Sequence, residues 1–400
     1  MGETSTMLRR FTLAPTLLFV FALLAAACSS PSSQTAYVPQ PFQATVMSPH
    51  GSKVIIVGSG KNSALDKLLV AFMESSQVPN AELAVSSKGK TIFSHAYTET
   101  SLAKTKTSTS TIMRLASVSK AWTDAAMFQL ISSHKVNPNA KVFAYLGITK
   151  PLPSSATVDP RVYDITIQNM IDHKSGWDDG VSNFDPTFNM RTIALNIGLT
   201  KAVNQTQYVQ AQLAQPLQEA PGTTYAYCNF CYTVLGMVVA KASKMSFAKY
   251  IADKVAAPLK LHNVLQSRTI GKPLPNEISH YYSAYSGPSA IFVRSNKQWP
   301  FPYSGDGMIL EVAGGASAIA TNAASMLTFM NHYIIWGTGT PQPGADWQRE
   351  GSMPGTNAWA EQLPNGTNYA VIVNTRQYDY GSNPNAFTNL QLAIEKQLNP

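Results

Sequence analysis

The stretch TIMRLASVSKAWTDAAMFQL, residues 111–130, carries the main clue to the fold and chemistry of this chain. It places Ser117 three residues before Lys120, at the start of a segment that is apolar on nearly every side. A segment of this kind predicts a central buried helix, and residues three apart lie on the same face of a helix. Ser-x-x-Lys alone is a weak signal, because it recurs elsewhere, for example at Ser246. The apolar context distinguishes Ser117.

The position of Ser117 suits a nucleophile. A hydroxyl just before a helix faces the positive end of the helix dipole, and the backbone N–H there is free to donate to a developing oxyanion. Burial would favour a neutral Lys120, which could accept the proton of the serine hydroxyl. The pair is therefore our candidate for nucleophilic catalysis.

Composition limits the class of protein. The 400 residues are 44% hydrophobic and 13% charged, enough to bury one large core or two modest ones. The net charge is +8, but the Lys and Arg residues are scattered and match no nucleic-acid-binding motif. We therefore expect a globular protein with no nucleic-acid partner.

The N-terminus predicts export. Arg9 and Arg10 precede an apolar stretch over about residues 13–24, and small residues follow up to Cys28, a pattern typical of a secretory signal. The end of this segment resembles a bacterial lipobox, in which Cys28 would be acylated; ordinary cleavage nearby with an incidental cysteine is the alternative. We predict a signal peptide over 1–27, a lipid-anchored linker over 28–60, and a location in the bacterial cell envelope, periplasmic or outer-facing.

The two other cysteines, Cys228 and Cys231, form a Cys-x-x-Cys pair. Zinc would need two further ligands, and no matching His or Cys pair occurs in the sequence. Inside a helix, residues three apart seldom reach disulfide geometry. The interpretation that we favour is two small buried residues.

Alternating patterns predict strands at both ends of the chain. Residues 81–97 alternate with period two around a turn at Lys88–Gly89, and a second hairpin is predicted at Asn365–Gly366. Residues 111–259 are mostly helical in pattern, and 386–398 form an amphipathic helix. These features predict an α+β fold with one antiparallel sheet from the N- and C-terminal segments, flanked by helices, with an inserted mostly helical region.

Several segments together resemble a known family. Besides MRLASVSKAWT, the segment PGTTYAYCNFCYTVLG contains Tyr227 and Asn229 in a Tyr-x-Asn pattern, ITIQNMIDHKSGW follows the family's His-Thr-Ser-Gly loop, and GGASAIATNAASMLTFM its Gly-Gly helix. In this order they resemble the serine β-lactamase-related family, which includes class C β-lactamases, D-alanyl-D-alanine carboxypeptidases, family VIII esterases and D-amino-acid amidases. The resemblance implies a β-lactamase/transpeptidase-like domain over 61–400, with Tyr227 and Asn229 in the active site. We expect His173 to be structural, like the other six histidines, because they show no metal-ligand spacing.

The third motif departs from the family pattern. Where the family has His-x-Gly or Lys-x-Gly on a strand, this chain has Arg349-Glu350-Gly351, followed by Ser352. The resemblance places Arg349, Gly351 and Ser352 in substrate binding, with the Ser352 N–H as second oxyanion donor. Arginine can bind a carboxylate in bidentate fashion but cannot shuttle protons at ordinary pH.

The sequence thus predicts an exported serine hydrolase that cleaves an ester or small amide through an acyl-enzyme at Ser117. Lys120 and Tyr227 would move the proton, with no metal or organic cofactor, and the protein would contact the membrane through a lipid at Cys28. A D-alanyl-type carboxypeptidase or a β-lactamase is the alternative enzyme. A non-catalytic envelope lipoprotein that binds a cell-wall peptide or another protein is the alternative of another class.

Overall fold

The computed structural model describes residues 41–48, 51–380 and 383–399. The predictions for the signal peptide and for Cys28 lie outside these residues. Among the described residues, no helix combines the length and apolar character needed to cross a bilayer.

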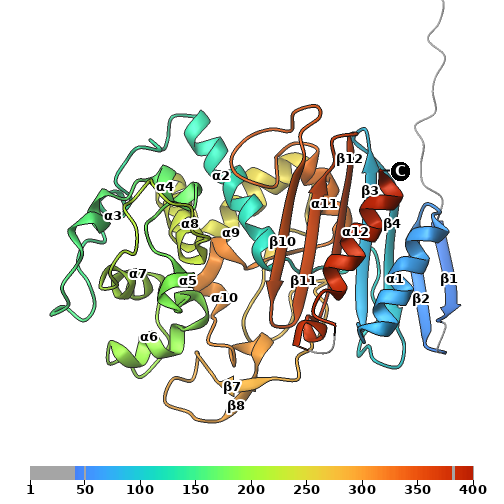
Figure 1. The fold of residues 1–400 in the computed structure, drawn as a ribbon, viewed down its shortest axis with the longest axis horizontal. Helices are drawn as coiled ribbons and strands as arrows, with labels where there is room; N and C mark the ends of the chain where they lie inside the picture. The colour runs from blue at the N-terminus through green and yellow to red at the C-terminus, as the bar shows by residue number, and fades with distance from the viewer. Residues whose placement is uncertain (1–40, 49–50, 381–382, 400) are drawn as a thin grey trace, which may run out of the picture. The chain divides into compact units, whose positions relative to one another are not determined.

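The domain contains a seven-stranded antiparallel sheet, which lies beside the helical region on the right in Figure 1. Its strands, in spatial order, are β1 (Pro41–Met47), β2 (Lys53–Ser59), β4 (Lys90–Glu99), β3 (Asn80–Ser87), β12 (Thr367–Val373), β11 (Thr356–Gln362) and β10 (Trp347–Met353). The N-terminal half of the sheet joins the C-terminal half where β3 pairs with β12. The prediction of one sheet built from both ends of the chain is confirmed.

The predicted linker boundary is wrong. Strands β1 and β2 lie within the segment 28–60 that the sequence predicts to be a tether, and they pair from Pro41 with Ser59 to Met47 with Lys53. β2 in turn pairs with β4. Side chains of β1 alternate between exposed and half-buried, so the strand buries little and its Pro- and Gln-containing sequence hides the alternation. The domain therefore includes residues from 41 onward.

Local turn chemistry explains two of the hairpins. Lys88 and Gly89 both have positive φ, 48° and 76°, as the tight turn between β3 and β4 requires. Gly366 has a φ of 79° in the turn before β12. Both predicted turns are confirmed.

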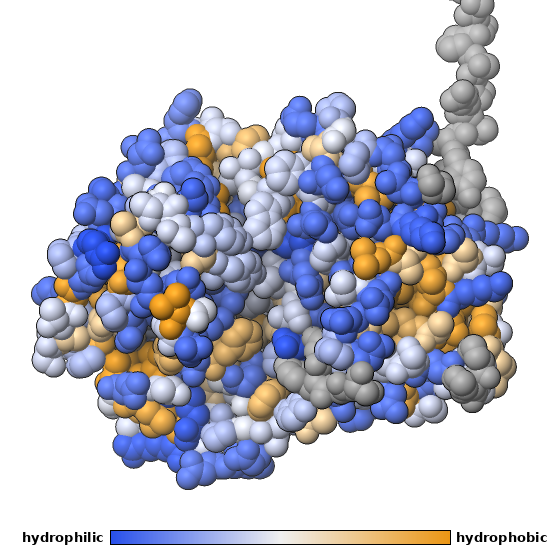
Figure 2. All heavy atoms as spheres, in the orientation of Figure 1, coloured by the Kyte–Doolittle hydropathy of each residue, from blue (hydrophilic) through white to orange (hydrophobic). Residues whose placement is uncertain are grey.

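The sheet separates two apolar cores. On one face lie α1 (Ser63–Ser75) and α12 (Ala386–Leu398), whose buried residues include Leu65, Leu69 and Ile394. The side of α1 and α12 that faces the viewer in Figure 2 carries an apolar patch, where a groove between the helices includes Leu68 and Leu390. The other face of the sheet packs against the helical region.

The helical region is built around two long buried helices, α2 (Ser119–Ser132) and α8 (Asn229–Ser243). Trp122 of α2 is fully buried, with its ring 4.2 Å from that of Phe329, which confirms the predicted central buried helix. The remaining helices are α3 (Val142–Leu146), α4 (Ile167–Ile171), α5 (Asp179–Ser182), α6 (Met190–Asn196), α7 (Gln205–Leu213), α9 (Phe247–Tyr250), α10 (Leu310–Ala313) and α11 (Ala323–Met330). One small sheet contains β5 (Met113–Arg114), β9 (Ile319–Thr321) and β6 (Leu265–Gln266). A second contains β7 (Ser286–Pro288) and β8 (Gln298–Pro300).

Candidate active site

Ser117 lies in a single 3-10 turn, Ala116–Val118, immediately before α2. Ala116 has a φ of 46°, a left-handed conformation that is uncommon for a residue with a side chain and that is often found at functional sites. The Ser117 hydroxyl lies 3.0 Å from Nζ of Lys120, so the structure brings the predicted pair together.

Lys120 is fully buried, and its Nζ has four polar partners, one of which is the Tyr227 hydroxyl. Besides Ser117 Oγ, it donates to Asn229 Oδ1 at 2.7 Å and to the Ala316 carbonyl at 3.0 Å. These last two oxygens can only accept, so a neutral amine would use both of its hydrogens on them and turn its lone pair to a hydroxyl, that of Ser117 or of Tyr227. Burial lowers the pKa of Lys120, Arg349 lowers it further, and Tyr227 and Asp185 oppose the shift. The geometry and the direction of the shift both suit a general base.

Tyr227 lies over Lys120, with Nζ 4.9 Å from the centre of its ring. The side chain is 37% exposed and forms part of the cleft wall, while its hydroxyl hydrogen-bonds to Lys120 and Ser117. Burial would raise the pKa of the Tyr227 hydroxyl, but the charge of Lys120 and these hydrogen bonds outweigh it, so the pKa is lowered. The phenol is therefore placed to exchange a proton with both groups.

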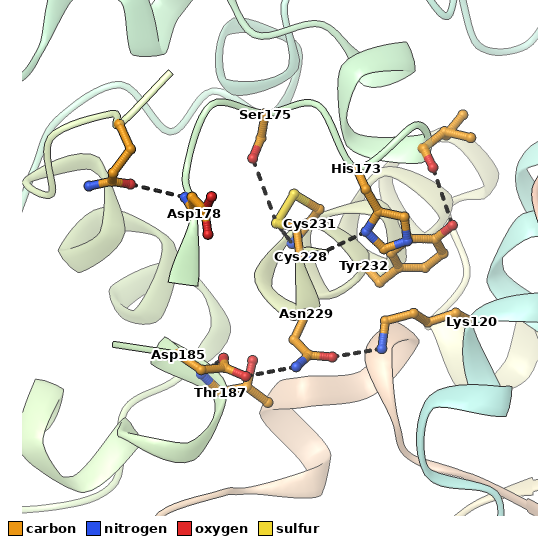
Figure 3. Close-up of a disulfide and its surroundings, with 12 residues drawn as sticks. Lys120, His173, Ser175, Asp178, Asp185, Thr187, Cys228, Asn229, Cys231 and Tyr232 are labelled. Atoms are coloured by element: carbon orange, nitrogen blue, oxygen red, sulfur yellow. Dashed lines mark hydrogen bonds between the residues drawn. A yellow bond between two sulfur atoms is a disulfide. The ribbon is translucent and has the colours of Figure 1, made fainter. Parts of the chain in front are cut away.

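Asn229 is the first residue of α8, and its side-chain amide is held at both ends. Oδ1 accepts from Lys120, and Nδ2 donates to Asp185 Oδ2 at 2.7 Å; Figure 3 shows this Asp185–Asn229–Lys120 chain. The fixed amide orientation presents an acceptor to Lys120. Sequence reasoning missed Asp185, which lies between α5 and α6 in a loop without a motif.

The structure does not place Arg349 in the cleft as predicted. The side chain is 2% exposed, and its Nη2 donates to Asp124 Oδ2 at 2.9 Å. Its Nε donates to the Ile335 carbonyl, and the guanidinium lies 4.4 Å from the ring centre of Trp336. Arg349 points away from the cleft because it pairs with Asp124, which lies one turn after Lys120 on α2 behind the site. The sequence held a signal for this, because Asp124 is the only acidic residue in that apolar helix.

Gly351 and Ser352 follow on β10, at the edge of the sheet. A Cβ at Gly351 would lie 2.1 Å from the Leu115 carbonyl oxygen and 3.0 Å from the Ser117 nitrogen. The absence of a side chain at Gly351 therefore allows β10 to pack directly against the turn that carries Ser117. Ser352 lines the cleft beside Ser117. Every second N–H of an edge strand points away from the sheet, and the oxyanion role of the Ser352 N–H stays a prediction.

His173 contacts the Tyr-x-Asn segment through the backbone of Cys228 and the ring of Tyr227. Its Nδ1 accepts the backbone N–H of Cys228 at 2.9 Å, and its ring stacks on Tyr227 with centroids 4.8 Å apart. Burial, followed by the charges of Lys120 and Arg349, lowers the pKa of His173 to about 3. The imidazole is therefore neutral at moderate pH, in keeping with a structural role.

Cys228 and Cys231 form a disulfide, which the sequence analysis did not favour (Figure 3). Cys228 is not inside a helix; it is the extended N-cap residue of α8, with φ −130° and ψ 101°. The two Cα atoms are 5.3 Å apart, a distance that a disulfide can span. The prediction failed because it treated both cysteines as lying inside a helix, whereas Cys228 precedes it.

A cleft of about 340 Å³ opens above Ser117. Its walls combine five aromatic or thioether side chains with six polar ones: Ser117, Thr187, Phe188, Tyr227, Asn229, Met308, Ser317, Trp336, Glu350, Ser352 and Met353. Among these described lining residues, none is Lys or Arg, and Glu350 is the only one with a carboxyl group. A ligand in the cleft therefore meets no lysine or arginine side chain among these lining residues, and the nearest cation is Lys120 behind Ser117.

Comparison with known proteins agrees with this geometry. The family model described as Beta-lactamase matches residues 65–389, a segment that contains every residue of the cleft. The chain belongs to the β-lactamase family. Its fold is the β-lactamase/transpeptidase-like fold, as predicted, and the family assignment supports a serine hydrolase of β-lactamase type.

Individual relatives of this β-lactamase-family chain are distant. Protein flp of Staphylococcus aureus (strain N315) is 24% identical over 217 residues, which cover 54% of this chain and 40% of that protein. A putative fimbrial assembly protein FimD of Dichelobacter nodosus is 27% identical over 215 residues, covering 54% and 47%. The matches thus span less than half the length of these curated relatives.

Solved structures resemble the chain in fold. D-amino acid amidase from Ochrobactrum anthropi SV3, complexed with D-phenylalanine, has a TM-score of 0.60 at 14% identity, covering 85% of this chain and 99% of that one. An octameric penicillin-binding protein homologue from Pyrococcus abyssi has a TM-score of 0.56 at 14% identity, covering 83% and 77%. At these identities the likeness concerns the fold alone.

Proposed function

We propose that the protein is a serine hydrolase that cleaves neutral esters or small amides through an acyl-enzyme at Ser117. The observation that carries the proposal is the set of contacts at Lys120. Two of its partners, Asn229 Oδ1 and the Ala316 carbonyl, can only accept hydrogen bonds, which leaves the lone pair of a neutral amine for a hydroxyl, and Ser117 Oγ lies 3.0 Å away.

In the first half of the reaction, the Ser117 oxygen attacks the carbonyl carbon of the substrate and Lys120 takes the hydroxyl proton. The backbone N–H groups of Ser117 and Ser352 would stabilise the oxyanion of the tetrahedral intermediate. When this intermediate collapses, the leaving alcohol or amine needs a proton, and the Tyr227 hydroxyl, linked to Lys120, can pass it on. The second half repeats these transfers in reverse with water, which releases the acid and restores Ser117.

The charge of the cleft favours neutral substrates over carboxylate-bearing ones. β-Lactams and peptides that end in D-alanine carry a carboxylate, for which a cation in the site would be expected. Here Arg349 is paired with Asp124 behind the cleft, and none of the lining residues is a lysine or an arginine. The amidases among the structural neighbours support amides as a second substrate class. A carboxypeptidase or β-lactamase is therefore the second candidate.

Export and a lipid anchor at Cys28 belong to the same proposal and rest on the sequence of residues 9–28. Metabolic labelling of the full chain with a radioactive fatty acid, beside a Cys28→Ala variant, tests the anchor. Label that enters the wild type and not the variant supports acylation at Cys28. Equal labelling of the two proteins would refute it.

The activity is tested with p-nitrophenyl butyrate and with neutral amino-acid p-nitroanilides, beside the Ser117→Ala variant prepared identically. We expect turnover by the wild type that disappears in the variant, and a fluorophosphonate adduct whose mass maps to Ser117. Turnover restricted to β-lactams or D-alanyl peptides would favour the second candidate. A folded wild type that neither turns over substrate nor forms the adduct would point to the non-catalytic envelope-binding protein.

A further inference from the structure

Two residues that contact Lys120 are the chain neighbours of Cys228, one of the two cysteines of the disulfide. Tyr227 precedes Cys228 and Asn229 follows it, and Cys228 is bonded to Cys231 in the first turn of α8 (Figure 3). Tyr227 contacts Lys120 with its ring and hydroxyl, and Asn229 does so with its amide oxygen. A covalent bond therefore sits within the motif that holds the base.

The chain changes from loop to helix at Cys228. Residues 214–228 contain no helix or strand, whereas α8 continues for fifteen residues from Asn229. Tyr227 thus lies at the end of a long irregular segment, and Asn229 lies on a rigid buried element. Irregular segments are held less strongly than helices, so the position of Tyr227 depends on how that segment is fastened.

Cysteine is an unusual residue at this boundary. Side-chain oxygens of Ser, Thr, Asp and Asn are the preferred caps of a helix N-terminus, but here Cys228 Sγ accepts the N–H of Cys231 at 3.0 Å. The disulfide fixes Sγ over this N–H. Close to Cys228, the segment is also held by the hydrogen bond from Cys228 N–H to His173 and the backbone bond from Ala226 N–H to the His173 carbonyl, and farther along by backbone bonds from residues 218, 219 and 222 to residues 174 and 176. Among the described contacts, the disulfide is the one covalent tie.

We propose that the Cys228–Cys231 disulfide is a positioning device for the active site, which holds Tyr227 and Asn229 in place against Lys120. The enzyme then reaches full activity only in its oxidised form. This inference rests on the proposed hydrolase function. Cys228 is 3% exposed and Cys231 is fully buried, so a protein reductase could not reach the bond in the folded state. The bond is therefore a permanent fastening rather than a cycling switch.

The test removes the bond and keeps a cap. In the double variant Cys228→Ser with Cys231→Ala, a hydroxyl replaces the capping sulfur, and no disulfide can form. We expect kcat for p-nitrophenyl butyrate to fall roughly tenfold or more, with KM changed less than about threefold, because a misplaced base slows the chemical step more than binding. The pH–rate profile should also shift, since its limbs depend on the distance between Tyr227 and Lys120.

The matched control is Ile394→Ala, in α12 on the opposite face of the sheet, which lowers stability without touching the site. We expect it to lower Tm while kcat and the pH–rate profile stay as in the wild type. A cysteine variant with unchanged kcat and pH–rate profile would overturn the proposal. So would a fall in kcat that the control reproduces at equal loss of Tm, since the bond would then contribute only general stability.

Two further measurements separate this inference from the proposed function. Non-reducing peptide mapping of the full-length protein should find Cys228 linked to Cys231, and two free thiols there would overturn the proposal. If the wild type proves inactive on every substrate, the proposed function fails on its own. Hydrogen exchange then tests the positioning role: the amides of residues 226–231 should exchange at least about tenfold faster in the cysteine variant, and unchanged exchange would refute it.

Discussion

The double variant Asp124→Asn with Arg349→Met replaces a buried ion pair by two neutral residues. It should be more stable and less active than the wild type. Burial raises the pKa of Asp124 from 3.8 to about 6, although Arg349 and a hydrogen bond from Tyr232 oppose the shift. At 1.36 kcal/mol per pKa unit, keeping this carboxylate ionised costs about 3 kcal/mol in the folded state at neutral pH. Asparagine keeps the acceptor oxygen that Tyr232 uses.

The stability difference between the double variant and the wild type should depend on pH. Because Asp124 binds its proton more tightly when folded, its contribution to stability is greatest at low pH and is lost as the pH rises from about 4 to about 6. The gain of the double variant should therefore grow over this range and stay constant at about 3 kcal/mol above it, within the range known for replaced buried ion pairs. Arg349→Met alone should not give this gain, because it leaves Asp124 buried without its cation.

Urea unfolding followed by tryptophan fluorescence measures these differences at several pH values between about 4 and about 7. We expect kcat to fall in the double variant, since Arg349 helps to lower the pKa of Lys120. A double variant less stable than the wild type at neutral pH would refute the reasoning. A gain that stays the same from pH 4 to pH 7 would show that the ionisation of Asp124 is not its source.

Three further substitutions test single features of the site. Tyr227→Phe removes the phenolic proton and should lower kcat roughly 100-fold with little change in KM, measured by initial rates on p-nitrophenyl butyrate; an unchanged kcat would exclude a relay through Tyr227. Gly351→Ala adds a Cβ that would lie 2.1 Å from the Leu115 carbonyl oxygen, so kcat should fall at least roughly tenfold while circular dichroism stays native. Glu350→Lys gives the cleft a cation and should raise kcat/KM for carboxylate-bearing peptides relative to neutral esters by about tenfold in a competition assay, whereas an unchanged ratio would place the charge of residue 350 outside the substrate's reach.

The sheet and the central helix could be predicted because their signals are local. Turn residues such as Lys88–Gly89 and the alternation of the flanking segments specify a hairpin within a few positions. The Ser117–Lys120 pair was found for the same reason, because both residues belong to one helical segment. β1 was missed because an edge strand that buries little shows only a weak alternation.

The role of Arg349 could not be predicted from its motif, because its partner Asp124 lies 225 residues away in the sequence. The buried charge in α2 was visible, but the sequence does not say which cation it meets. The disulfide depended on a smaller detail, the residue at which α8 begins. A shift of one residue moves Cys228 from a helical to an extended conformation and changes whether the two sulfurs can bond.

The pairing of β3 with β12 has a consequence for the order in which the molecule can be made. β3 ends at residue 87, and its neighbour begins at residue 367, so some 280 residues must be synthesised before the middle of the sheet can close. The edge strand β10, which touches the nucleophile turn through Gly351, also comes from this late segment. A nascent chain that ends before β10 can already contain Ser117, Lys120 and Tyr227, but it lacks the strand that completes the cleft. A premature stop anywhere before residue 347 would yield an inert product, however much of the catalytic motif it retained.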